Sequence, residues 1–200
     1  MFKKINKELG QASRLLLVLA VVVLVAVLIT FLIMKMAEKP PKPTTPTTSV
    51  PLPVYEKQLG DINFIFESAI DKGNVLKVSD IKDNQYGYSS QNNLTTGERF
   101  IQVTVGAQNK GTENTEQNAW DIENIVDSKG RNFVPDDQST VGPWLPNPDL
   151  CGALLKPAFQ PTPCTKIYEV SKVSTGLKIT VVIKKDNGKK DSFLLDLIVK

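Results

Sequence analysis

Histidine is absent from the 200 residues of this chain. Its absence excludes Ser-His-Asp and Cys-His hydrolysis and the common histidine-containing zinc sites. A Ser-Lys dyad of the signal-peptidase type needs a proline three residues after the serine, and no serine here has one. The sequence therefore predicts no catalytic residue, no cofactor and no metal site, and we expect a protein that is not an enzyme.

Cysteine is scarce, since the chain has only Cys151 and Cys164. Outside the cytoplasm an isolated pair at this separation is most simply a disulfide. The alternative, a reactive or metal-binding pair of thiols, would lack both a CxxC spacing and a histidine. We predict a disulfide, and with it an oxidising compartment.

An excess of basic charge is also missing from most of the chain. The formal net charge is +3, but residues 1–42 contain seven lysines and arginines and only two glutamates. The rest of the chain contains 17 of the 24 basic residues and 19 of the 21 acidic ones. Because it has no basic run with interleaved aromatic residues, nucleic-acid binding is not expected.

Residues 15–34 form a run that contains no charge and a single hydroxyl, that of Thr30. As a helix this run would be roughly 30 Å long, the thickness of a bilayer core. The alternative is that this run belongs to a cleaved signal peptide, but it is longer than the apolar segment of most such peptides. We predict an uncleaved single-pass signal anchor, with residues 1–14 cytoplasmic and the remainder extracytoplasmic.

Residues 35–54 are rich in proline and threonine, a composition typical of an extended linker. After it the apolar residues alternate with period two, which predicts β-strands. The strand segments are 62–66, 75–81, 101–107, 120–126, 165–170, 177–183 and 193–199. Turn residues occur at 71–74, 109–111, 127–130 and 186–188. We predict that residues 55–200 form an all-β domain, an immunoglobulin-like β-sandwich of seven or eight strands.

Residues 135–163 interrupt this rhythm with seven prolines and no clear period. Long loops in compact domains tend to be functional, and this one carries apolar side chains. One interpretation makes them a lid over an open end of the sandwich. The other makes Trp144, Leu145 and Phe159 an exposed surface for interaction with a partner.

Three pairs of carboxylates are candidates for a site: Asp136 with Asp137, Asp80 with Asp83, and Asp121 with Glu123. Each has an ordinary structural explanation in a turn or on the polar face of a strand. A calcium site needs six to eight oxygen ligands, and the twelve-residue calcium loop pattern is absent. They are not predicted to bind metal.

Several short motifs follow one another along the chain: RFIQVTV (99–105) running into NKGT (109–112), DSKGRNF (127–133), LKP (155–157) and KIYEV (166–170). Together they resemble a telokin-like, immunoglobulin-fold domain of unknown function that follows lipobox or transmembrane anchors on bacterial cell-surface proteins. In this family a glycine usually follows the LKP proline, where this chain has Ala158. The resemblance implies a bacterial extracytoplasmic β-sandwich and no catalytic residues.

The anchor, linker and loop together lead to the hypothesis of a membrane-anchored module of the cell envelope that binds a protein or a cell-wall component. The alternative is a passive structural or assembly subunit of the envelope. The sequence specifies neither the ligand nor the oligomeric state.

Overall fold

The computed structural model describes residues 17–30, 52–81, 91–185 and 188–200. The chain divides into two units, Met1–Val50 and Pro51–Lys200. In the first, residues 17–30 form a helix whose side chains are all exposed. The Thr30 hydroxyl donates to the carbonyl oxygens of Ala26 and Val27, at 3.0 and 2.9 Å.

The described helix covers only part of the predicted membrane anchor. Residues 15, 16 and 31–34 of that anchor lie outside the described part, as do residues 1–14 and 35–51. Within the described residues, no helix is both long and apolar enough to cross a membrane.

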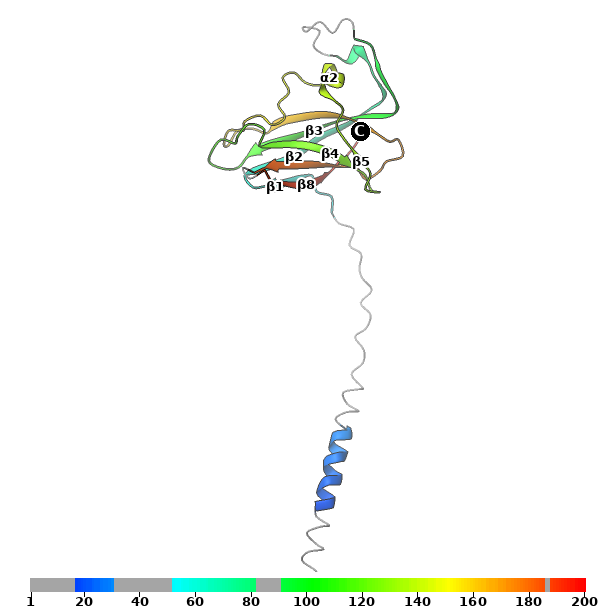
Figure 1. Cartoon of the computed structure of the whole chain (residues 1–200), viewed down its shortest axis with the longest axis vertical. Coiled ribbons are helices and arrows are strands. Elements are labelled where there is room, and N and C mark those ends of the chain that lie inside the picture. Colours follow the sequence, from blue (N-terminus) through cyan, green and yellow to red (C-terminus); the bar gives the residue numbers. More distant parts are fainter. Residues whose placement is uncertain (1–16, 31–51, 82–90, 186–187) are drawn as a thin grey trace, which may run out of the picture. The chain divides into compact units, whose positions relative to one another are not determined.

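The second unit is a mostly β structure of two antiparallel four-stranded sheets (Figure 1). The first sheet has the order β1-β2-β3-β6, with β1 Glu56–Leu59, β2 Ile62–Leu76, β3 Leu94–Asn109 and β6 Thr162–Val170. The second has the order β5-β4-β7-β8, with β5 Asn132–Phe133, β4 Trp120–Val126, β7 Lys178–Lys184 and β8 Lys190–Asp196. The described part of this unit is thus mostly β, as predicted, and its eight strands fall within the predicted seven or eight.

One hydrophobic core is shared by the facing sides of the two sheets. Alternate residues of β3 are buried in it, as the period of two predicts: Ile101, Val103, Val105 and Ala107. Trp120 of β4 is fully buried opposite them, and its ring lies edge-on to Phe64 with the centroids 6.2 Å apart. Burial of such large side chains supplies most of the driving force for folding.

The predicted turn at residues 71–74 is wrong. Strand β2 continues through it, because β2 pairs with β3 on both sides of these residues. The Asp71 side chain accepts a hydrogen bond from the Gly73 amide at 2.8 Å, and Gly73 takes a φ of +69°. The result is an irregularity within the β2–β3 ladder rather than a chain reversal. The separate strand predicted at 75–81 is therefore absent, since its first residues complete β2 and Val78–Asp80 form a short 3₁₀-helix, η1.

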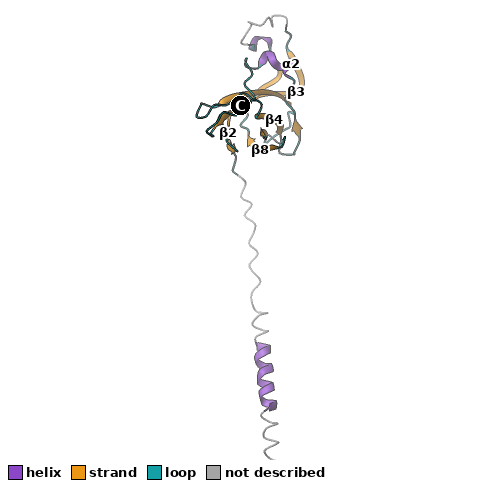
Figure 2. Ribbon diagram, turned by 60° about the vertical axis from the view of Figure 1, so that its left-hand side comes forward, coloured by secondary structure: helices purple, strands orange, loops and turns teal. Residues whose placement is uncertain are grey.

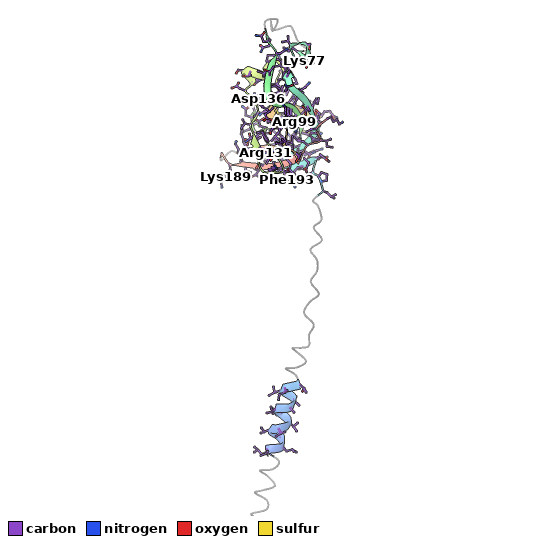
Figure 3. The ribbon with its side chains drawn as sticks, turned by 90° about the vertical axis from the view of Figure 1, so that its right-hand side faces the viewer. Lys77, Arg99, Arg131, Asp136, Lys189 and Phe193 are labelled. Carbon is purple, nitrogen blue, oxygen red and sulfur yellow. A yellow bond between two sulfur atoms is a disulfide. The ribbon has the colours of Figure 1, made fainter. Side chains whose placement is uncertain are left out.

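The turn between β4 and β5 follows the prediction. Asp127 accepts hydrogen bonds from the amides of Lys129 and Arg131 and from the Arg131 side chain (labelled in Figure 3). Burial raises the pKa of Asp127, but the bonds from Arg131, Lys129 and Ser174 outweigh it and lower that pKa to about 2. The β7–β8 hairpin is also as predicted, although residues 186–187 of its turn lie outside the described part.

The long loop contains a short helix, α2 Gln138–Val141, followed by a 3₁₀-turn, η4 Gly142–Trp144. These elements cover a second, smaller cluster of buried residues: Leu76, Phe100, Val141 and Ile167. Phe100 and Ile167 alternate with the core residues Ile101 and Tyr168, so this cluster lies on the outer face of the first sheet. The loop therefore covers the outer face of the first sheet rather than an open end of the domain. Figure 2 shows α2 on one side of β3, with β4 and β8 on the other side.

Candidate functional site

A cleft of about 430 Å³ lies beside β6, between that strand and the long loop. Four carboxylates line it, those of Asp121, Asp136, Asp137 and Asp149. Lys166 contributes the one ammonium group of this lining, so the formal charge of the cleft is −3. Pro135, Leu145 and Ile167 provide apolar surface. A concave site with a few convergent polar groups on an apolar wall is the usual form of a ligand pocket.

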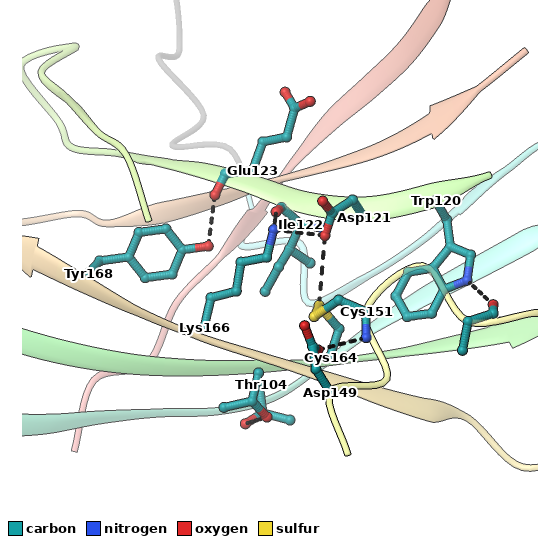
Figure 4. Close-up of a disulfide and its surroundings, with 12 residues drawn as sticks. Thr104, Trp120, Asp121, Ile122, Glu123, Asp149, Cys151, Cys164, Lys166 and Tyr168 are labelled. Atoms are coloured by element: carbon teal, nitrogen blue, oxygen red, sulfur yellow. Dashed lines mark hydrogen bonds and ion pairs between the residues drawn. A yellow bond between two sulfur atoms is a disulfide. The ribbon is translucent and has the colours of Figure 1, made fainter. Parts of the chain in front are cut away.

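Asp121 and Lys166 neutralise each other at the border of the two sheets (Figure 4). The Lys166 ammonium lies 2.8 Å from Asp121 Oδ1 and donates to the Ile122 carbonyl at 2.7 Å. Nearby, the buried Tyr168 hydroxyl donates to the Glu123 carbonyl at 2.7 Å. These bonds connect β6 to β4 and leave the other three carboxylates to supply the net charge of the cleft.

Asp136 is the least satisfied of the four carboxylates. Its backbone amide donates to the Ile167 carbonyl at 2.9 Å, which places the residue against β6. Its Oδ2 atom is buried and has no hydrogen-bond partner among the described residues. Burial, together with the charge of Glu169, raises the pKa of Asp136. A cationic or hydrogen-bond donating group in the cleft would satisfy this oxygen.

Asp137 and Asp149 hold the loop backbone in place. Asp137 caps α2, accepting from the Ser139 amide at 2.7 Å, and hydrogen bonds from the Ser139 side chain and backbone lower its pKa. Asp149 accepts from the Cys151 amide at 2.9 Å. Both carboxylates are exposed, and each keeps an oxygen that these bonds do not use.

A disulfide joins Cys151 in the loop to Cys164 in β6, with the two Cα atoms 4.5 Å apart. The predicted pairing is confirmed. Cys151 lines the cleft, so the disulfide fixes this wall to the sheet (Figure 4). Asp121 lies close to both sulfur atoms, but sulfurs bonded to each other are not thiolate ligands, and this group does not form a metal site.

The predicted interaction residues do not form one surface. Trp144 and Leu145 are half-buried and pack against the second cluster, and the Trp144 indole donates to the Lys77 carbonyl at 2.8 Å. Leu145 also lines the cleft. Phe159 is 60% exposed, with the Lys156 ammonium 5.4 Å from its ring centroid. The structure thus brings Leu145 to the cleft and leaves Phe159 apart from it.

Sequence reasoning considered Asp121, Asp136 and Asp137 but explained each one locally, and it did not consider Asp149. Asp121, the pair Asp136 and Asp137, and Asp149 come from three separate segments of the chain, which meet because the loop runs back along β6. The signal that could have found them was the disulfide, because pairing Cys151 with Cys164 necessarily brings Asp149 close to β6.

Comparisons with known proteins assign no family. No protein-family model matches the chain, and no curated protein matches it. A solved conserved hypothetical protein from Bacillus anthracis is 16% identical, with a TM-score of 0.43 over 70% of this chain and 93% of that one. A functionally unknown protein from Listeria monocytogenes EGD-e is 9% identical, with a TM-score of 0.39 over 73% of this chain and 82% of that one.

Replacing Asp136 by asparagine is expected to raise the free energy of unfolding at pH 7 by less than about 1 kcal/mol, because it removes a charge that is incompletely solvated in the folded state but still partly screened by water. The raised pKa means that the contribution of Asp136 to stability is fully present below its ordinary value of 3.8 and is lost as the pH rises through the folded-state pKa. Urea unfolding at pH 7 and pH 3 measures this. A gain of equal size at both pH values would contradict the assignment.

Proposed function

We propose that this chain is a membrane-anchored extracytoplasmic binding module. In this proposal residues 15–34 are the anchor, with the N-terminus cytoplasmic, and residues 35–54 are the linker. Two observations support the anchor: residues 17–30 are an apolar helix with exposed side chains, and the Thr30 hydroxyl is hydrogen-bonded within it. The disulfide supports an oxidising compartment.

We further propose that the β-domain is immunoglobulin-like and belongs with the telokin-like extracytoplasmic domains that its motifs resemble. Two antiparallel sheets around one core are compatible with this assignment. Val54, the last residue of the proposed linker, is bonded to the last strand, because its amide donates to the Asp196 side chain of β8 at 2.7 Å. Asp196 also forms an ion pair with Lys178 at 3.0 Å. A domain whose linker is bonded to its last strand is suited to presenting a binding surface away from a membrane.

The cleft beside β6 is the observation that carries the binding role. Its size is within the range of ligand pockets, roughly 300–1,000 Å³, and its charge of −3 favours a partner that presents a cation. The role proposed is binding rather than catalysis, because Asp121 is neutralised by Lys166 and the sequence offers no histidine to move a proton. The partner is a protein or a cell-wall component.

Photocrosslinking in native cells tests this function. A photoreactive residue replaces Gln138, which is exposed at the edge of the cleft, and separately replaces Phe159 and, as the control, Asp191 in β8. We expect one dominant foreign product from position 138 that is absent at position 191. Capture of the chain itself would favour the assembly subunit. Equal products at positions 138 and 191, or none at either, would contradict the binding module.

A further inference from the structure

We propose that the cleft is a strand-addition site, in which an extended segment of a partner protein carrying a lysine or arginine pairs with the open edge of β6 at Thr165. This rests on the binding role proposed above and specifies the partner as a basic peptide segment. Its three supports are the unpaired strand edge, the position of the loop beside it, and the charge around it.

Strand β6 is the last strand of its sheet, so one of its edges is turned away from β3. The β3–β6 ladder is regular, with Gln102 opposite Ile167 and Thr104 opposite Thr165. In an antiparallel strand the amide and carbonyl of one residue point to the same side, and every second residue points outward. The Ile167 carbonyl points outward, since it accepts from Asp136. Thr165, two residues earlier, therefore also presents its amide and carbonyl on the outer edge.

The loop pairs with this edge only at Ile167 and Tyr168, toward the C-terminal end of β6. Pro135 pairs with Tyr168 as an isolated antiparallel bridge, and the Asp136 amide donates to Ile167. The chain then turns away into α2 at Gln138, and the cleft begins where it leaves the strand. Within the described residues the Thr165 amide and carbonyl have no partner outside the sheet. Thr165 is only 8% exposed, and the cleft that it lines is the route to its outer edge. The loop thus begins a strand pairing that an incoming segment would continue.

The charge around this edge selects a basic segment. Asp136, Asp137 and Asp149 surround the opening and are not balanced by Lys166, which is paired with Asp121. The buried Oδ2 atom of Asp136 lacks a donor, which an ammonium or guanidinium group would provide. Leu145 and Ile167 offer apolar surface to the aliphatic part of a lysine or arginine. Backbone pairing would give the affinity, and this pocket for one side chain would give the specificity.

Binding to defined peptides tests the proposal with the full chain in lipid nanodiscs. The probe is a fluorescein-labelled, blocked hexapeptide of alternating valine and threonine with one central lysine, measured by fluorescence anisotropy. Its two companions carry glutamate in place of the lysine, or methyl groups on the backbone nitrogens. We expect the lysine peptide to bind with a Kd below about 1 mM, and each companion to bind at least about tenfold more weakly.

A matched pair of variants separates the backbone from the side chain. Thr165→Pro removes the outward amide, and Thr165→Val keeps it; both lose the hydroxyl contact with Thr104, which is 3.0 Å long. We expect Thr165→Pro to weaken binding about tenfold and Thr165→Val to bind as the unmodified chain does. Asp136→Asn should also weaken binding, whereas Asp191→Asn on the distant strand β8 should not.

Equal binding of the methylated and unmethylated peptides to the unmodified chain would overturn strand addition, as would the absence of any binding by the lysine peptide. This comparison needs no variant, so it stands even if Thr165→Pro fails to fold. If the lysine peptide fails but crosslinking at Gln138 captures a partner, strand addition is wrong and the binding module stands. If both experiments fail, both proposals are wrong.

Discussion

Replacing Cys151 and Cys164 together by serine is expected to lower the free energy of unfolding by about 3 kcal/mol. The two cysteines are 13 residues apart in the sequence, and the disulfide restricts the unfolded chain by closing that loop. Urea unfolding followed by far-ultraviolet circular dichroism measures the loss. Treating the unmodified chain with a reducing agent should produce the same loss and serves as the control.

The folded structure around the disulfide should survive its removal. Other bonds hold the segment that follows Cys151: the Trp120 indole donates to the Ala153 carbonyl at 2.8 Å, and the Asn118 amide donates to the Gly152 carbonyl at 2.7 Å. Amide hydrogen exchange should therefore keep its order relative to the rest of the domain in the double serine variant at Asn118, which donates to Gly152, and at Leu155, which donates to the Thr115 hydroxyl at 2.8 Å. A loss below about 1 kcal/mol would contradict the account in which the disulfide stabilises the domain by restricting the unfolded chain.

The strands were predictable because their signal is local. A strand with one buried face alternates every two residues, so β3, β7 and β8 could be recognised directly from the sequence. Strand β4 begins with the same alternation, which an irregularity between Ile122 and Ile125 interrupts. Strand β1 has mostly exposed residues and no such alternation, and β5 is only two residues long. Both were missed because only their neighbours in the folded sheet define them.

The turn predicted at residues 71–74 shows the limit of local chemistry. Aspartate and glycine at this spacing favour a reversal, but the same Asp71 side chain contact with Gly73 also forms inside a continuous strand. The long partner β3 stabilises the continuous arrangement, which the sequence of β2 alone does not reveal. At Ala158, by contrast, the backbone conformation agrees with the expectation although the residue type does not. The family resemblance placed a glycine there, and the structure gives Ala158 a φ of +61°, a conformation that glycine adopts at lower cost.

The cleft could not be predicted because it depends on where a loop without periodicity comes to lie. Its wall is made by Pro135 and Asp136 running beside β6, a pairing of two residues with no sequence signature. The apolar residues of the loop did predict that it packs against the domain. They did not predict which face of the domain the loop covers. Phe100 and Ile167 alternate with the core residues, at positions that would face solvent if the second cluster did not cover them.

Replacing Trp144 by alanine is expected to lower the free energy of unfolding by about 2 kcal/mol. The Trp144 ring packs against the second cluster, and its indole nitrogen donates to the Lys77 carbonyl, so the variant loses both contacts. The cost should be below the roughly 3–5 kcal/mol of a fully buried aromatic residue, because Trp144 is only half-buried. Trp144→Phe keeps most of the packing and should lose about 1 kcal/mol, the share of the hydrogen bond.

Phe159→Ala is the matched control, because Phe159 is 60% exposed and the Lys156 ammonium lies over its ring. It should change stability by less than about 0.5 kcal/mol. This comparison separates the two interpretations of the loop. If Trp144→Ala destabilises the domain and Phe159→Ala does not, Trp144 is part of the cover. If Trp144→Ala leaves unfolding unchanged but abolishes crosslinking from position 138, the indole contacts the partner and the assignment of Trp144 to the second cluster is wrong.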